Sequence, residues 1–155
     1  MNDATPERLD PGSTIGILGD GQLGRMIALA AARLGYRCHT FADKPDSPAA
    51  QVCAASTLAE YHDKKALDAF AAAVDVVTLE FENIPEEPVR YLADRVPVRP
   101  GPDVLAVAQD RMLEKDFLNG IGIPTAPYAH VTDLPSLEAA VNEIGRPSVL
   151  KTAKF

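Results

Sequence analysis

Apolar and polar positions in the first hundred residues alternate between short apolar runs and stretches with helical periodicity. The run at residues 15–18 predicts a strand, and the pattern over 22–34 predicts a helix, with Gly35 in the position of a C-terminal cap glycine. The apolar residues that share one face of this helix are Leu23, Ile27, Ala30, Ala31 and Leu34. Such a face is typical of a helix that packs on a core.

The alternation continues to about residue 100. Further strands are expected at "YRCHTFA", "QVCAAS" and "DVVTLEF", and an edge strand at "VPV", residues 96–98. Helices are expected after an N-cap at Asp63 and over residues 85–93. The inward-facing residues of the first of these are Ala66, Leu67, Phe70, Ala71 and Val74. Strands and helices in this order predict an α/β fold, a parallel sheet covered on both faces.

The composition changes at "RPGPD", residues 99–103, where two prolines and a glycine indicate a domain boundary. Asp103 is then expected to cap a helix that runs to about Asn119. Another helix is expected after Asp133, with one face formed by Leu134, Leu137, Val141 and Ile144. Gly145 is expected to end it.

The last run, "PSVLKT", predicts a buried strand that ends near Lys151. Because the sequence stops at Phe155, we expect the second unit to be incomplete. The expected organisation is a loose tail at 1–12, a first domain at 13–100 and the beginning of a second domain at 101–155.

Composition excludes several classes of function. The chain has 155 residues, of which 46% are hydrophobic and 24% charged, and this balance predicts a folded protein. Its net charge of −7, with no run of Lys or Arg, argues against nucleic acid and anionic membranes as partners. No apolar window approaches the roughly 18 residues of a membrane span, and no signal peptide is evident, so we expect a cytoplasmic chain. Cys38 and Cys53 are interpreted as reduced thiols.

A glycine motif lies between the first expected strand and helix. Gly19, Gly21 and Gly24 form G-x-G-x-x-G, whose free amides and helix terminus favour an anion such as phosphate. A dinucleotide site also needs an acidic residue about 20 positions further on. Asp43 lies 19 residues after Gly24, so a nicotinamide cofactor remains an alternative at this point, as does a purely structural turn.

Other polar residues follow expected strands or lie on helices. Glu80, Glu82 and Asn83 come at the carboxyl end of the "DVVTLEF" strand, where a carboxylate could accept hydrogen bonds from sugar hydroxyls or be a solvated loop acid. Arg111 and Lys115 are four positions apart on one helical face, an arrangement that is often only solvated. Lys151 directly follows an apolar run, where an ammonium group needs an anionic partner.

Six stretches in this order resemble one enzyme family. They are "GDGQLGRM", Y-x-D at residues 61–63, "DVVTLEFENIP", "QDRMLEK", "GIPTAPY" and "VLKT". Together they closely resemble the N5-carboxyaminoimidazole ribonucleotide synthases of the ATP-grasp superfamily, over about residues 14–152. The resemblance implies a Rossmann-like, pre-ATP-grasp domain that binds substrate, followed by the incomplete start of an ATP-grasp domain.

The resemblance also implies an activity and its ligands. Enzymes of this family use ATP and Mg²⁺ to carboxylate 5-aminoimidazole ribonucleotide with bicarbonate in purine biosynthesis, and a homodimer that uses the N-terminal domain is expected. By similarity, Gln22 and Leu23 approach the 5′-phosphate in a turn shaped by Gly21 and Gly24, and Glu80 takes the ribose hydroxyls. The resemblance implies ATP contacts for two further residues, Arg111 and Lys151.

The sequence departs from the family at its end. The glycine-rich loop that covers the ATP phosphates and the acidic Mg²⁺ ligands are not present, so catalytic residues and metal ligands are expected outside this chain, which alone should lack activity. Two alternatives remain: part of a nicotinamide-dependent oxidoreductase, and a non-catalytic nucleotide-binding module. No role is assigned to Arg25, Asp43, Glu82 or Asn83, and His39, His62 and His130 match no catalytic or ligand arrangement.

Overall fold

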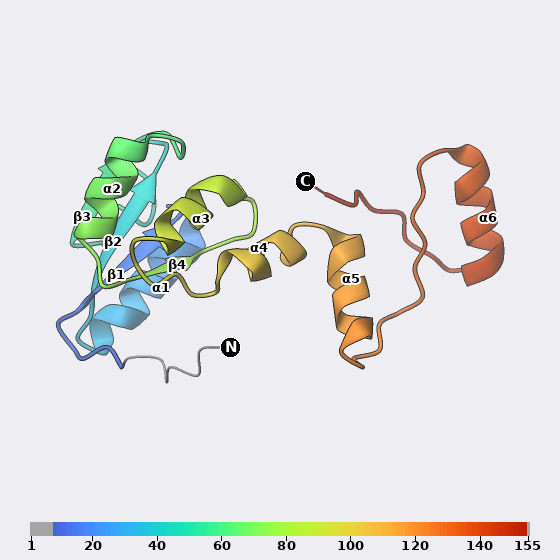
Figure 1. The fold of residues 1–155 in the computed structure, drawn as a ribbon, viewed down its shortest axis with the longest axis horizontal. Helices are drawn as coiled ribbons and strands as arrows, with labels where there is room; N and C mark the ends of the chain where they lie inside the picture. Colours follow the sequence, from blue (N-terminus) through green and yellow to red (C-terminus); the bar gives the residue numbers. More distant parts are fainter. Residues whose placement is uncertain (1–7, 155) are drawn as a thin grey trace. The chain divides into compact units, whose positions relative to one another are not determined.

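A computed structural model describes residues 8–154 of the chain. The chain divides into two compact units between Leu105 and Ala106, and each is described by itself (Figure 1). The expected domain boundary at residue 100 lies shortly before this division. In the described part of the expected tail, the Gly12 amide donates to Gly35 O at 2.8 Å, and residues 1–7 lie outside the described range.

The first unit contains a four-stranded, fully parallel sheet. Its strands are β1 (Thr14–Leu18), β2 (Arg37–Ala42), β3 (Ala55–Leu58) and β4 (Val76–Leu79), and their order in the sheet is β3-β2-β1-β4. The predicted parallel α/β fold is confirmed. Strand β1 lies between β2 and β4. Its carboxyl end therefore lies in the middle of the row formed by the carboxyl ends of the strands, which is called the carboxyl edge of the sheet below.

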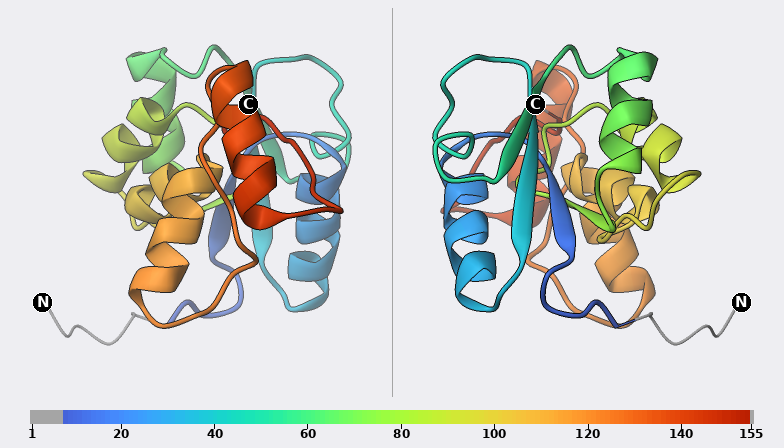
Figure 2. Two further views of the ribbon diagram at one scale, coloured as in Figure 1. Left: turned by 90° about the vertical axis from the view of Figure 1, so that its right-hand side faces the viewer. Right: turned by 90° about the vertical axis from the view of Figure 1, so that its left-hand side faces the viewer.

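Helices cover both faces of this sheet, as Figure 2 shows. On one face lies α1 (Gln22–Arg33), which packs with Ile17 and Cys38. On the other lie α2 (Lys64–Ala72) and α3 (Glu86–Ala93), around a larger cluster that includes Phe41 and Phe70. Side chains along each strand contribute to the two faces in turn, because successive side chains of a strand point to opposite faces of the sheet.

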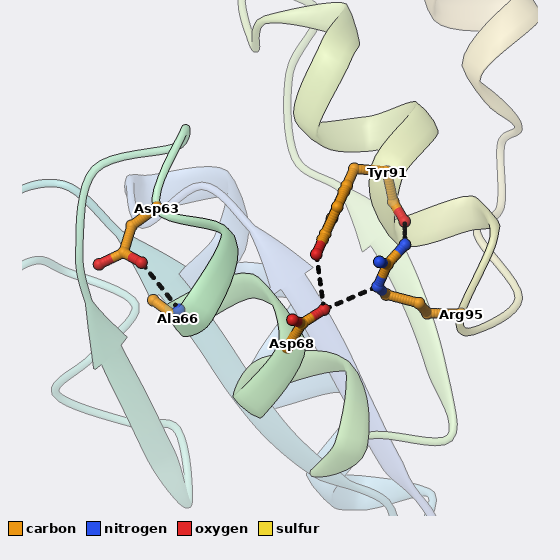
Figure 3. A network of polar contacts seen from close by, with 5 residues as sticks. All are labelled: Asp63, Ala66, Asp68, Tyr91 and Arg95. Atoms are coloured by element: carbon orange, nitrogen blue, oxygen red, sulfur yellow. Dashed lines mark hydrogen bonds and ion pairs between the residues drawn. The ribbon is translucent and has the colours of Figure 1, made fainter.

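Helix α2 is bounded and held as the pattern predicts. Asp63 is its N-cap, and its carboxylate accepts the Ala66 amide at 3.0 Å. Leu67 and Phe70 are buried on the expected face. On the outer side, Asp68 accepts hydrogen bonds from the Tyr91 hydroxyl at 2.9 Å and Arg95 Nε at 2.7 Å, which joins α2 to the α3 region (Figure 3).

The buried face of α1 matches the expected one only in part, at Ala31, which is buried, and at Ile27, which packs against the same cluster. Its buried residues are Gly24, Ala28 and Ala31, whereas Leu23 is 55% exposed and Leu34 is 68% exposed. The periodicity was correct for a helix, but the small residues face the sheet. Small side chains allow the helix backbone to approach the strands closely, which leaves larger residues beside this face, such as Leu23, in solvent. Gly35 ends the helix with a φ of +85°, as predicted.

Two expected strands of this unit are different in the structure. The strand expected at "QVCAAS" begins only at Ala55, because residues 48–54 form turns. The expected edge strand at 96–98 is reduced to a single parallel bridge between Val98 and Val77. Proline at position 97 has no amide to donate to a ladder, which limits pairing at this edge.

The helix expected from Asp103 to Asn119 is two helices. They are α4 (Pro102–Ala108), which spans the division between the units, and α5 (Arg111–Gly120). Asp110 interrupts the pattern because its carboxylate caps α5, accepting the amides of Met112 at 2.8 Å and Leu113 at 3.2 Å. The next helix, α6 (Leu134–Ile144), begins with a capping box at Asp133 and Ser136 and ends at Gly145, as expected.

The buried strand expected at "PSVLKT" is not formed. Residues 147–152 have no regular structure, and Val149 and Leu150 are 80% and 68% exposed. A strand needs a neighbouring strand for its backbone groups, and the described residues of the second unit contain none. No helix in the described range has the length and apolar character to cross a membrane.

Candidate functional site

The site is built where the adjacent strands β1 and β4 end. After Leu18 the chain passes through Gly19, Asp20 and Gly21 and enters α1 at Gln22. In the register between the two strands, Leu18 lies opposite Leu79, so Glu80 is the first residue beyond β4 at the same edge. The Glu80 amide donates to Leu18 O at 3.2 Å. The pairing therefore brings the glycine loop and Glu80 together, as parallel strands of an open sheet allow.

The Glu80 carboxylate binds the glycine loop directly. One oxygen, Oε1, accepts the Gly21 amide at 2.9 Å, and the other, Oε2, accepts the Gly24 amide at 2.5 Å. Gly21 is the N-cap residue of α1 and Gly24 lies in its first turn, so both amides belong to the positive end of the helix. An internal carboxylate thus already uses part of the anion-binding capacity that the glycine motif predicts.

All three motif glycines lie against this carboxylate. A Cβ on Gly21 would lie 2.8 Å from Glu80 Oε1, and the three atoms nearest to it all belong to Glu80. A Cβ on Gly19 or Gly24 would come closer still to the Glu80 side chain. Gly19 also has a φ of +108°, which other residues rarely adopt. The motif is therefore explained by space for Glu80 as well as by the tight turn.

Two amides at the start of α1 remain available. The Arg25 amide makes the first intrahelical bond, to Gly21 O at 3.1 Å. Within residues 8–154, the amides of Gln22 and Leu23 have no hydrogen-bond acceptor, and both residues are exposed. Free amides at a helix N-terminus are a favourable site for phosphate oxygens. The loop can thus present two amides to a ligand while two others hold Glu80.

The loop is fixed by contacts to neighbouring segments. The Thr40 hydroxyl donates to Gly19 O at 2.6 Å, and the Gly19 amide donates to Phe41 O at 3.1 Å. The Ala49 amide donates to Asp20 O at 3.0 Å. Because these contacts come from β2 and the turn that follows it, the loop geometry depends on the sheet rather than on the glycine motif alone.

Tyr61 and Asp20 belong to the same edge, and the sequence assigned neither a role. Burial raises the pKa of Tyr61 well above its ordinary value, and three nearby carboxylates raise it further, which keeps the hydroxyl protonated as a donor. They are, in order of effect, Asp43, Asp20 and Glu80. Asp20 Oδ2 is buried and has no hydrogen-bond partner within the described residues. A hydroxyl or amine of a ligand could satisfy this acceptor.

Other residues of the first unit that the sequence analysis names have different surroundings. Arg25 Nη1 donates to Gln51 Oε1 at 2.7 Å and to Pro48 O at 3.3 Å, so it ties α1 to the turn after β2. Glu82 and Asn83 are exposed on the loop that follows Glu80. His39 is buried, with Nε2 2.8 Å from the Thr57 hydroxyl, a contact between strands.

The second unit brings its two expected ATP ligands into one region. The Arg111 amide donates to Ala153 O at 2.9 Å, and Arg111 Nε donates to Thr152 O at 3.2 Å. Lys151 precedes this contact and its side chain is exposed. The start of α5 thus lies beside the segment that carries Lys151. In the described range, no cluster of three or more His, Cys, Asp or Glu side chains could hold a metal ion.

Comparison with known proteins identifies the family. The model of the ribonucleotide synthetase preATP-grasp domain matches residues 12–109. The chain belongs to this family. Over 147 residues it is 50% identical to an N5-carboxyaminoimidazole ribonucleotide synthase of Brucella melitensis, covering 95% of this chain and 41% of that protein. The expected pre-ATP-grasp fold is therefore confirmed, and the nicotinamide alternative based on Asp43 is not supported.

Solved structures agree with this assignment. An ADP complex of an N5-carboxyaminoimidazole ribonucleotide synthetase superposes with a TM-score of 0.87 at 41% identity, over 95% of this chain and 39% of that one. The Aspergillus clavatus synthase in complex with ADP and 5-aminoimidazole ribonucleotide gives a TM-score of 0.77 at 28% identity, over 88% and 37%. The chain thus spans between 37% and 41% of the length of these relatives.

Proposed function

We propose that this chain is the N-terminal, substrate-binding part of an ATP-dependent ligase. The complete protein would carboxylate 5-aminoimidazole ribonucleotide with bicarbonate to N5-carboxyaminoimidazole ribonucleotide, a step of purine biosynthesis. The observation that carries the proposal is that the first turn of α1 holds the Glu80 carboxylate with two amides and leaves two others free, within the described residues, for a ligand. It is supported by the likeness to synthases over 95% of the chain.

The share of this chain in that reaction is to hold the ribonucleotide. The free amides of Gln22 and Leu23 would bind the 5′-phosphate, favoured by the positive end of α1. Glu80 would accept hydrogen bonds from the ribose hydroxyls, since each of its oxygens keeps a lone pair beyond the one used by the loop. Bicarbonate and the carboxylation chemistry would be handled by residues outside this chain.

ATP would be contacted by Arg111 and Lys151, two cations that fit a polyphosphate. Bound Mg²⁺ would neutralise charge on the transferred phosphoryl group, and its ligands would come from sequence outside this chain. We also propose a homodimer and a cytoplasmic location. Exposed apolar residues on α1, Met26 at 59% and Leu29 at 48%, support a contact through the first unit.

The decisive experiment is an assay of ATP consumption by the complete protein. We expect ADP to form only when 5-aminoimidazole ribonucleotide and bicarbonate are both present. Omission of either substrate is the control. Hydride transfer with a nicotinamide cofactor, or binding of the ribonucleotide without any ATP cleavage, would contradict the proposal and favour one of the alternative classes.

A binding measurement on the complete protein tests the site that this chain carries. Glu80→Ala should weaken ribonucleotide binding by about 1.5–3 kcal/mol, the range for hydrogen bonds to a charged group, and leave ATP affinity unchanged. Glu87→Ala is a suitable control because Glu87 is an exposed residue that pairs across the surface with His62. An equal loss of affinity for both ligands would indicate a folding defect instead.

A further inference from the structure

The glycine motif is usually interpreted as space for a phosphate, but the contacts here indicate another purpose. The three heavy atoms nearest to a Cβ placed on Gly21 all belong to Glu80, the closest at 2.8 Å. The same side chain is nearest to a Cβ placed on Gly19 or Gly24. A side chain at these positions would therefore meet Glu80 first.

The hydrogen bonds of the loop amides also indicate that the glycines serve Glu80. The first turn of α1 offers amides that have no acceptor within the helix. Gly21 and Gly24 direct theirs to Glu80, and Gln22 and Leu23 keep theirs free within the described residues. The four amides are thus divided into two sets, one for the protein's own carboxylate and one for a ligand.

We propose that the glycines of this motif act as positioning residues for Glu80 and not as a bed for the phosphate. By leaving room for the carboxylate on the Gly21 and Gly24 amides, they fix its remaining lone pairs toward a vicinal diol. The part of this inference that concerns a ligand rests on the proposed function. The site would select a ribose phosphate over a 2-deoxyribose phosphate, because a fixed acceptor loses a partner when one hydroxyl is absent.

A double-mutant cycle separates this role from the usual interpretation. Gly21 has φ −79° and ψ −162°, a conformation open to alanine, so Gly21→Ala adds a methyl group without backbone strain. With Glu80 present, the methyl group displaces the carboxylate. With Glu80→Ala, the space is vacant and the methyl group has nothing to displace.

The first readout needs no ligand. Urea unfolding of the 155-residue chain, followed through hydrogen exchange of β1 amides, reports the stability of the first unit. We expect Gly21→Ala to raise the unfolded-to-folded ratio by on the order of tenfold in the Glu80 background and to have little effect in the Glu80→Ala background. Gly101→Ala is the matched control, since a Cβ there meets nothing within 4 Å and should show no coupling. An equal cost of Gly21→Ala in both backgrounds would overturn the inference.

The second readout is affinity for ribose 5-phosphate, 2-deoxyribose 5-phosphate and inorganic phosphate. Gly21→Ala should weaken ribose 5-phosphate by on the order of tenfold, abolish its advantage over the deoxy compound and leave inorganic phosphate unchanged. In the Glu80→Ala background it should have no further effect. A loss of inorganic phosphate affinity in both backgrounds would show that Gly21 serves the phosphate and would overturn the inference. Absence of any ribose phosphate binding by the unsubstituted chain, with the unfolding cycle still coupled, would contradict only the proposed function.

Discussion

Glu80 accepts amides from residues 59 and 56 positions earlier in the chain, and this single side chain organises the site. The sequence indicated Glu80 as a ligand for ribose hydroxyls and the glycines as a phosphate loop, two separate roles. In the structure the two features are one constellation. No local pattern reveals it, because the contact depends on the pairing of β1 with β4.

His39 gives a prediction on pH at the residue scale. Burial lowers its pKa below the ordinary 6.5, so the folded state favours the neutral imidazole. As pH falls below about 6.5, the unfolded chain takes up a proton that folded His39 resists, and stability should decrease. Above this pH both states are neutral and His39 contributes no pH dependence.

The measurement is the free energy of unfolding between pH 7.5 and pH 5, compared with that of His39→Gln. The slope of stability against pH should be smaller in the variant, because its contribution from residue 39 is removed. Identical slopes would show that folded His39 protonates as readily as the unfolded residue.

At the scale of elements, α2 follows local rules and α1 follows packing. Asp63, Leu67 and Phe70 have the roles that spacing and capping predict. In α1 the same reasoning was right for Ala31 and wrong for Leu23, because small residues such as Gly24 pack against the sheet while Leu23 is exposed. The close approach of helix and strand depends on how side-chain volumes fit between them. The hydrophobic periodicity of the sequence gives no information on this fit.

The cap of α2 provides the element-scale prediction. Asp63→Ala removes the acceptor of the Ala66 amide and should destabilise the first unit by about 1 kcal/mol, within the range of about 0.5–2 found for N-caps. Asp63→Asn should restore most of this loss, since asparagine caps equally well. Urea unfolding measures both.

Lys65→Ala is the control for this prediction, because Lys65 is exposed on the same helix and carries no capping contact. It should change stability by no more than about 0.5 kcal/mol. If Asp63→Asn proved as unstable as Asp63→Ala, the charge of Asp63, and not its hydrogen bond, would be what stabilises the helix.

At the scale of the whole molecule, the two units differ in how much apolar surface they bury. The first has two clusters of buried side chains on the faces of its sheet. Among described residues of the second, Ala140 is the buried apolar side chain, and large residues such as Phe117, Ile121 and Leu134 are between 52% and 66% exposed. The second unit therefore lacks a core of its own within the described range.

This difference predicts how the 155-residue chain binds its ligands. Calorimetric titration should show weak but measurable binding of 5-aminoimidazole ribonucleotide, because the first unit carries a formed site, and negligible binding of ATP. The Glu80→Ala chain is the control, and its heat of ribonucleotide binding should be lost. Micromolar affinity for ATP would contradict the prediction and show that Arg111 and Lys151 suffice to hold the nucleotide.

The sequence alone determined the alternation of strands and helices in the first unit, the parallel sheet and the cap at Asp63. The cap and the periodicity of each element depend on near neighbours in the chain and so appear as spacing, and the parallel sheet follows from the alternation of strands and helices. Only the tertiary structure decided which face of α1 is buried, and that residues 147–152 form no strand there. It also decided that the amides of Gly21 and Gly24 hold Glu80, because that contact requires the register of two strands more than fifty residues apart.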